Sequence, residues 1–144
     1  MILASLIERG FDVSVPFGGG QPYDLMLDLG GWEVLKVQCK TGWQAKGCIT
    51  FNTRSTDHGQ GRRPYFGLAH IFAVYFPLTR SVYLVPLDAV GGFRGWLRLE
   101  PPRNNQQKGI RFAADFGIDQ WPIVRLLEAK REAEVTAEPE LNFA

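Results

Sequence analysis

The sequence contains few of the residues that build disulfide frameworks or zinc sites. It has two cysteines, Cys39 and Cys48, and its two histidines are dispersed. Two cysteines do not make the cross-linked scaffold of a small secreted domain, and this set lacks the ligand spacing of a zinc site. We therefore expect both cysteines to be reduced, with Cys39 on the buried face of a strand.

Long apolar runs are also missing. No stretch approaches the roughly 18 residues that a membrane-spanning helix needs. The opening MILASLIERG has neither a basic n-region nor a small-residue cleavage site. With 144 residues, of which 45% are hydrophobic and 22% charged, the chain is long enough for one domain with a real core. These features predict a cytoplasmic globular protein with no membrane partner.

Acidic residues are scarce in the middle of the chain, although the net charge is only +1. Between residues 41 and 112 the acids are Asp57, Asp88 and Glu100. The basic residues of that stretch are Lys46, Arg54, Arg62, Arg63, Arg80, Arg94, Arg98, Arg103, Lys108 and Arg111. Such segregation is typical of a surface that binds a polyanion. The alternative is a solvated face on which arginine serves solubility.

Apolar periodicity predicts one helix and several strands. Ile2, Leu3, Leu6 and Ile7 have helical spacing, and Gly10 suits the position just after a helix end. Strands are expected over residues 11–17, 23–29, 32–40, 48–53, 71–77, 81–86 and 95–100, with a Gly-Gly turn at 30–31 and a short helix over 87–90. The combination predicts an α+β fold around a twisted, mostly antiparallel sheet.

Three further segments lack a clear apolar period. Residues 54–64 contain several glycines and predict a mobile loop, and residues 101–109 predict a polar loop. Residues 119–132 predict a helix broken at Pro122. The acidic tail over 131–144 has the composition of a disordered segment. We therefore place a single domain at residues 1–130.

Polar side chains occur on two neighbouring apolar strands, in the stretch PYDLMLDLGGWEVLKVQCKTG. Side chains alternate along a strand, so Gln38 and Lys40 share one face while Cys39 lies on the other. The hairpin can bring Asp24 opposite the end of that polar row, and we expect Asp24 and Lys40 to be solvated. The alternative is an ordinary amphipathic hairpin with one solvent-exposed face.

These groups have the chemistry that hydrolysis of a phosphodiester requires. A hard cation needs oxygen ligands, which Asp24, Gln38 and the main-chain carbonyl of Cys39 can supply. The Lys40 ammonium can orient or deprotonate the attacking water, or stabilise the charged phosphate. The spacing alone is common in random sequence, so it carries little weight by itself.

The same stretch resembles the signature of the PD-(D/E)xK nuclease superfamily, in the variant with Gln at the second acidic position. The segments RGFDVSVPFGGGQPYDL, FAVYFPLTRSVYLVPLDAVGG and LRLEPPRNNQQKGIRFA resemble the group I intron-associated homing endonuclease branch. The similarity covers about residues 5–118. It implies a restriction-endonuclease-like α-β-β-β-α-β core, in which a central, mostly antiparallel mixed sheet is flanked by helices.

For activity, the resemblance implies cleavage of double-stranded DNA with Mg²⁺ or Mn²⁺. It assigns the metal-binding acid to Asp24, the second ligand position to Gln38 and the catalytic lysine to Lys40. Related homing enzymes oligomerise to reach two DNA strands, so we expect a homo-oligomer, a dimer or a tetramer. The apolar segment IFAVYF, residues 71–76, is the expected place for that contact.

The sequence departs from the family pattern at two places. The superfamily's first helix usually carries an acidic residue well before its Arg-Gly end, whereas this chain begins eight residues before that end. Glu8 and Asp12 are the available substitutes. Ala69-His70 stands where an acidic residue is expected, and His70 is either a structural residue or a phosphate contact. A shortened or degenerate copy of the family is therefore expected.

The expected DNA contacts come from the basic middle of the chain. Amides in RNNQQKG can pair with adenine edges and flanking cations can contact phosphates, although a plain polar connection has the same composition. The candidates are Lys46, Arg54, Arg62, Arg63, Arg103, Asn104, Asn105, Gln106 and Lys108. Trp43 and Trp96 are expected in the core or in a subunit interface.

The sequence therefore predicts a metal-dependent DNA endonuclease of the homing type. One alternative is a catalytically silent remnant that keeps the basic DNA-binding surface without a working metal site. Another alternative is a structure-selective nuclease that acts on DNA junctions during repair.

Overall fold

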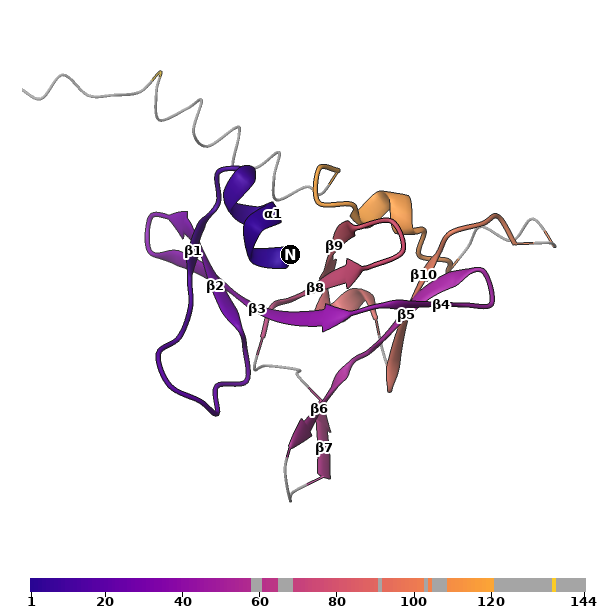
Figure 1. Ribbon diagram of the computed structural model, residues 1–144, viewed down its shortest axis with the longest axis horizontal. Helices are drawn as coiled ribbons and strands as arrows, with labels where there is room; N and C mark the ends of the chain where they lie inside the picture. The colour runs from indigo at the N-terminus through magenta and orange to yellow at the C-terminus, as the bar shows by residue number, and fades with distance from the viewer. Residues whose placement is uncertain are drawn as a thin grey trace, which may run out of the picture.

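The computed structural model describes residues 1–57, 61–64, 69–90, 92–102, 104, 109–120 and 136, with the backbone alone for 55–57 and 61–64. The chain begins with α1 (Ile2–Glu8) and continues mostly in strands (Figure 1). Two short 3₁₀ helices, η1 (Leu87–Ala89) and η2 (Ala113–Phe116), are also present in this part of the chain.

The main sheet contains β1 (Asp12–Ser14), β2 (Leu25–Gly30), β3 (Glu33–Thr41), β8 (Ile71–Phe76) and β9 (Ser81–Pro86), in that spatial order. Two antiparallel hairpins, β2–β3 and β8–β9, meet where β3 pairs with β8 in parallel. The sheet is therefore mixed and mostly antiparallel, which confirms the prediction.

A second, antiparallel sheet has the order β10-β5-β4, formed by β10 (Arg94–Arg98), β5 (Cys48–Asn52) and β4 (Trp43–Ala45). The sequence did not predict β4, because three residues are too few to show an alternating pattern. A separate ribbon pairs β6 (Arg54–Asp57) with β7 (Gly61–Pro64) and projects away from both sheets (Figure 1).

The β6–β7 ribbon corrects the mobile loop predicted over residues 54–64. Arg54 pairs with Pro64, and Asp57 pairs with Gly61. The prediction was wrong because backbone pairing forms this ribbon, while its polar side chains give no apolar period from which a strand can be read.

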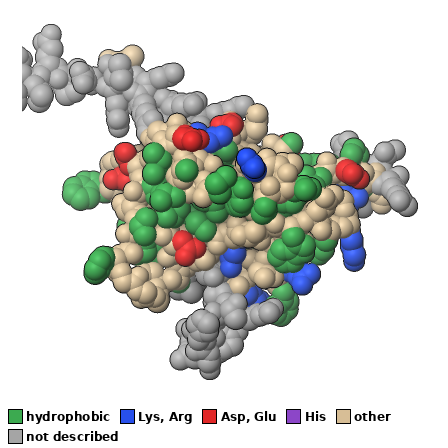
Figure 2. Space-filling view, viewed as in Figure 1, with side chains coloured by type: hydrophobic (Ala, Val, Ile, Leu, Met, Phe, Trp, Pro, Cys, Tyr) green, Lys and Arg blue, Asp and Glu red, His purple; other side chains and the backbone are tan. Residues whose placement is uncertain are grey.

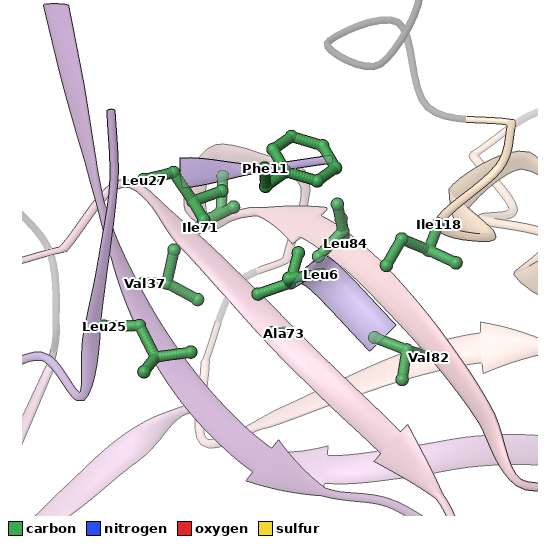
Figure 3. Close-up of a cluster of buried hydrophobic side chains, with 10 residues drawn as sticks. All are labelled: Leu6, Phe11, Leu25, Leu27, Val37, Ile71, Ala73, Val82, Leu84 and Ile118. Atoms are coloured by element: carbon green, nitrogen blue, oxygen red, sulfur yellow. The ribbon is translucent and has the colours of Figure 1, made fainter. Parts of the chain in front are cut away.

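The first core lies between α1 and one face of the main sheet (Figure 3). Leu6 of α1 is fully buried against Val37 of β3 and Ala73 of β8. Cys39 packs against this cluster, on the face that alternation predicted for it. The helix ends before Gly10, whose φ of +82° is a conformation that favours glycine.

The second core fills the space between the other face of the main sheet and the second sheet. Phe72 of β8 meets Phe51 of β5 edge to face, with ring centroids 5.6 Å apart and planes inclined at 66°. Gly95 of β10 lies opposite Phe51, and a Cβ there would clash with the Phe51 ring. The two sheets therefore pack closely at this point.

Burial corrects the expectation that IFAVYF serves oligomerisation. These residues form β8, which lies inside the main sheet between β3 and β9. All of its side chains except that of Tyr75 are buried. A strand with both edges paired and both faces covered has no surface left for a subunit contact.

Two sequence predictions near the C-terminus lie almost wholly beyond the described residues. Of the helix expected over 119–132, the structure describes Asp119 and Gln120, which are in a turn. Of the tail expected over 131–144, it describes Thr136. Within the described ranges, no helix has both the length and the apolarity needed to cross a membrane.

Candidate functional site

Asp24 precedes β2 and is bound to β3 through its main chain and its side chain. Its N–H donates to the Val37 carbonyl at 2.8 Å. Its Oδ2 accepts hydrogen bonds from Gln38 Nε2 and from the Cys39 N–H, each at 2.8 Å. The structure thus brings Asp24 and Gln38 together, and two donors orient the carboxylate.

The strand register places this polar group on the main-sheet face opposite α1. Leu25 pairs with Val37, and both are buried in the cluster beneath α1. Residues one position away point to the other face, which is therefore the face of Asp24, Gln38 and Lys40.

Lys40 is half-buried, so its side chain is less solvated than the sequence predicted. Its partner on β8 is Val74, a member of the second core. Burial lowers the pKa of Lys40 below its ordinary value of 10.5, and the negative charge of Asp24 offsets part of this effect. The Lys40 Nζ also donates to the Arg54 carbonyl at 3.5 Å. The start of β6 thus lies beside the ammonium.

Cys39 contributes its backbone to the site, whereas its thiol stays inert. Burial, followed by the negative charge of Asp24, raises the pKa of the Cys39 thiol to about 12. A thiol with this pKa is protonated at neutral pH and is a poor nucleophile. The chemistry available from Cys39 is therefore that of its N–H and carbonyl groups.

The oxygen atoms around Asp24 are of the chemical type that a hard cation binds. Asp24 Oδ1 accepts no hydrogen bond from a described residue. The Cys39 carbonyl lies on the same edge of β3 as the Cys39 N–H. Because the β2–β3 ladder ends at the pair Leu25–Val37, this carbonyl lies past the last pair of the ladder. A half-turn of the Gln38 side-chain amide would place its oxygen where its nitrogen now lies. Mg²⁺ and Mn²⁺ accept such ligands.

Asp24 is the one carboxylate that the described part of the chain places at this site. In the described ranges, no three His, Cys, Asp or Glu side chains group around a common point. Asp12 pairs with Asp28, which is about 13 Å along the strand from Asp24. Glu8 belongs to α1, which covers the opposite face of the sheet. Neither expected substitute therefore adds a second acid beside Asp24.

His70 is held as a structural residue. Its Nδ1 accepts the Lys36 N–H at 2.8 Å, and its own N–H donates to the Lys36 carbonyl at 2.9 Å. The Leu87 N–H donates to the His70 carbonyl at 3.2 Å. These bonds join the start of β8 to β3 and to η1, which favours the structural interpretation over a phosphate contact.

The expected DNA contacts are only partly within the described residues. Lys46 and Asn104 are exposed. Arg54 is half-buried, with its Cζ 3.7 Å from the centroid of the Phe93 ring. Arg62 and Arg63 are described by backbone alone, as part of β7. The candidates outside the described residues are Arg103, Asn105, Gln106 and Lys108.

Sequence reasoning missed an aromatic and basic face on the second sheet. Trp43 is 39% exposed and Trp96 is 40% exposed, so neither belongs to the core. The Arg94 Cζ lies 5.4 Å from the Trp43 ring centroid. Alternation along GWLRL could have shown Trp96 on the face of Arg94 and Arg98. Figure 2 shows Lys and Arg side chains mainly at the lower right, below β4 and β5.

Comparison with known families decides what kind of protein carries this site. The model of the PD-(D/E)XK endonuclease family matches residues 1–119. The chain belongs to the PD-(D/E)XK endonuclease family. The match spans every element from α1 to η2 and includes Asp24, Gln38 and Lys40. Membership of the PD-(D/E)XK endonuclease family supports a nuclease function, and such nucleases generally use divalent metal ions.

The solved structures support the fold of this PD-(D/E)XK chain. The bacterial homing endonuclease I-Ssp6803I is similar, with 20% sequence identity and a TM-score of 0.59 over 91% of this chain and 88% of that one. This likeness shows a restriction-endonuclease-like fold, which confirms the predicted fold class. No curated protein matches the sequence.

Proposed function

We propose that the chain is a metal-dependent endonuclease that hydrolyses phosphodiester bonds in double-stranded DNA, in the manner of a homing endonuclease. One observation carries the proposal. In a chain of this nuclease family, the Asp24 carboxylate is hydrogen-bonded to Gln38 and to the Cys39 N–H, on the face that also bears Lys40.

The cation would be held by Asp24, Gln38 and the main-chain carbonyl of Cys39. Mg²⁺ or Mn²⁺ bound there would polarise the phosphate and neutralise its charge. One carboxylate and two neutral oxygens make a weak site, because a hydrated Mg²⁺ gives up its waters reluctantly. Phosphate oxygens of the DNA would add negative charge, so metal and DNA should bind together.

Lys40 would act on the attacking water. Its lowered pKa brings the neutral amine closer to physiological pH, which suits proton transfer. While still charged, the ammonium would orient the water and stabilise negative charge on the phosphate. The Asp24 charge, which raises the Lys40 pKa, limits how far the proton-transfer role extends toward neutral pH.

DNA would lie along the basic part of the chain. The β6–β7 ribbon carries Arg62 and Arg63 at positions paired with Thr56 and Ser55. Two-stranded β-ribbons fit the major groove of B-DNA, and cations on them contact phosphates. Lys46, Asn104 and the remaining candidates named from the sequence would extend this contact.

Nicking of supercoiled plasmid tests the proposal. We expect the wild-type chain to nick plasmid DNA with Mg²⁺ or Mn²⁺ and to stop when EDTA is added. Asp24→Asn and Lys40→Met should both reduce nicking to background while duplex binding is retained. Equal nicking by the wild-type and Asp24→Asn chains would show that the chemistry lies elsewhere.

The single carboxylate favours one alternative, a DNA-binding protein without turnover. In that case the wild-type chain binds duplex DNA but leaves plasmid intact with either metal. A second comparison separates the repair alternative, because a structure-selective nuclease would cleave a four-way junction much faster than a duplex of the same sequence. The proposal requires the duplex to be cleaved at least as fast.

A further inference from the structure

A cavity of about 390 Å³ lies on the second sheet, away from the polar row of β3. It is bounded by the turn between β4 and β5, by strands β5 and β10, and by residues 109–111. The lining residues are Lys46, Cys48, Trp96, Arg98, Gly109, Ile110 and Arg111. The volume falls in the usual range of small-ligand sites, about 300–1,000 Å³.

Three cations line this cavity, from three separate segments. Arg98 is held by a hydrogen bond from its Nε to the Glu100 carbonyl at 2.9 Å, and Arg111 by one from its Nε to the Ala89 carbonyl at 3.3 Å. Within the described ranges, no carboxylate oxygen lies within 4 Å of Lys46, Arg98 or Arg111. Two of the three cations are therefore held in place, and none of the three has a close counterion among the residues that the structure describes.

One acidic group lies near the rim of the cavity. The Oε2 of Glu100 comes within 3.7 Å of the place that a Cβ on Gly47 would occupy. Among the residues that the structure describes, this one carboxylate stands beside three cations, so the net charge is positive and the cavity should attract an anion.

Flat apolar surface accompanies the charge. Thr50 of β5 pairs with Trp96 of β10 on one side and with Trp43 of β4 on the other. Both tryptophans therefore lie on the outer face of the second sheet. Trp96 forms a wall of the cavity, and Ile110 and Cys48 add apolar lining. Aromatic side chains beside cations are the combination that binds single-stranded nucleic acid, by stacking of bases and pairing with phosphates.

We propose that this cavity holds one unpaired nucleotide of a DNA strand, with its base against Trp96 and its phosphates on Lys46 and Arg111. This inference rests on DNA as the partner in the proposed function. An isolated phosphate would leave Trp96 and Ile110 unused, and an acidic peptide has no planar group to stack on Trp96. Bases inside a duplex are already stacked, so the site should prefer a strand end or a displaced strand.

The test measures binding of a fluorescent dT8 oligonucleotide by anisotropy, over a range of salt concentrations. All chains carry Asp24→Asn, so cleavage does not interfere. The variants are Trp96→Ala, Trp96→Phe and Arg111→Glu. Arg80→Glu is the matched control, because it makes the same charge change in the exposed β8–β9 turn, outside the cavity. Thermal unfolding by circular dichroism confirms that each variant is folded.

Each variant has a distinct expected result. Trp96→Ala should weaken dT8 binding roughly 5- to 150-fold with an unchanged salt slope, since stacking contributes about 1–3 kcal/mol per base. Trp96→Phe, which keeps a ring, should bind within about threefold of the parent chain. Arg111→Glu should weaken binding and lower the slope of log K against log salt by about 0.7, the value for one phosphate of a single strand. Arg80→Glu should change binding less than Arg111→Glu does.

Several outcomes would overturn the inference. Equal decreases in affinity for Arg111→Glu and Arg80→Glu would mean a general charge effect, and an unchanged affinity in Trp96→Ala would remove the stacking. Inorganic phosphate or a poly-glutamate peptide that displaces dT8 at equal charge concentration would show that any anion suffices. Plasmid nicking tests the proposed function separately, because it depends on Asp24 and needs no binding at the cavity.

Discussion

Gln38 Nε2 lies 2.8 Å from Asp24 Oδ2, and the Cys39 N–H donates to the same oxygen at the same distance. One oxygen of the carboxylate thus takes two donors from β3, while Oδ1 accepts no hydrogen bond from the residues that the structure describes. The acid is thus held in place by the fold through one oxygen, and neither of these two hydrogen bonds uses its other oxygen. Substitutions of Asp24 and Gln38 therefore test the proposed metal site directly.

Replacing Asp24 should separate its structural role from its chemical one. Asp24→Asn keeps an acceptor for the Cys39 N–H, so the free energy of unfolding should change little. Asp24→Ala removes that acceptor and should lower it by about 1 kcal/mol. Both variants should lose nicking. Urea denaturation and the plasmid assay check this, and cleavage retained by Asp24→Asn would contradict the metal role of Asp24.

Gln38→Glu should couple stability to divalent metal. It would replace a hydrogen bond by two neighbouring carboxylates, whose repulsion should lower the melting temperature in EDTA. Mg²⁺ would relieve the repulsion, so its addition should raise the melting temperature more in Gln38→Glu than in the wild type. Differential scanning calorimetry with and without Mg²⁺ measures both effects. An equal response of the two chains would place the cation away from Gln38.

Lys40→Met should stabilise the protein while it abolishes cleavage. The folded state lowers the Lys40 pKa, so between that value and the ordinary 10.5 the unfolded chain binds more protons. Below this pH window, the partly buried charge of Lys40 therefore lowers the free energy of unfolding. This loss becomes smaller as the pH rises toward 10.5. The wild type should be less stable than Lys40→Met at neutral pH, and the gap should close in alkali.

Urea unfolding of both chains over a pH series measures this gap. A control variant, Lys46→Met, removes the charge of an exposed lysine and shows how much of the difference comes from the loss of a surface charge. A wild type that is more stable than Lys40→Met at neutral pH would show that the Asp24 and Arg54 contacts outweigh burial.

Reversing charge on the β6–β7 ribbon should weaken duplex binding through salt-dependent contacts. Arg62→Glu with Arg63→Glu should lower the slope of log K against log salt by about 0.9 for each phosphate that the variant no longer neutralises. Asn104→Ala with Asn105→Ala should instead alter sequence preference and leave the slope nearly unchanged. Filter binding to duplexes of different sequence distinguishes the two. An affinity that ignores salt in the wild type would remove DNA as the partner.

Local periodicity predicted most of the elements of the main sheet. Helical spacing in residues 2–7 and Gly10 gave α1 and its end, and alternation gave β2, β3, β8 and β9. Such patterns are readable because each element buries one face, and the burial repeats along the chain with the period of that element. The β6–β7 ribbon could not be predicted because backbone pairing forms it. Strand β4 could not be predicted because it is only three residues long.

The sequence by itself determined that Asp24, Gln38 and Lys40 are present at the family's spacing, and that the middle of the chain is basic. Only the tertiary structure decided how these residues lie relative to one another and to the rest of the chain. The start of β6 and the second core partly bury Lys40 and so lower its pKa, and strand register places α1, with Glu8, on the opposite face. Packing of the second sheet also left Trp96 beside Arg98 and Arg111 at one cavity. Burial, register and the meeting of distant segments depend on the folded chain, whereas residue type and spacing are written in the sequence.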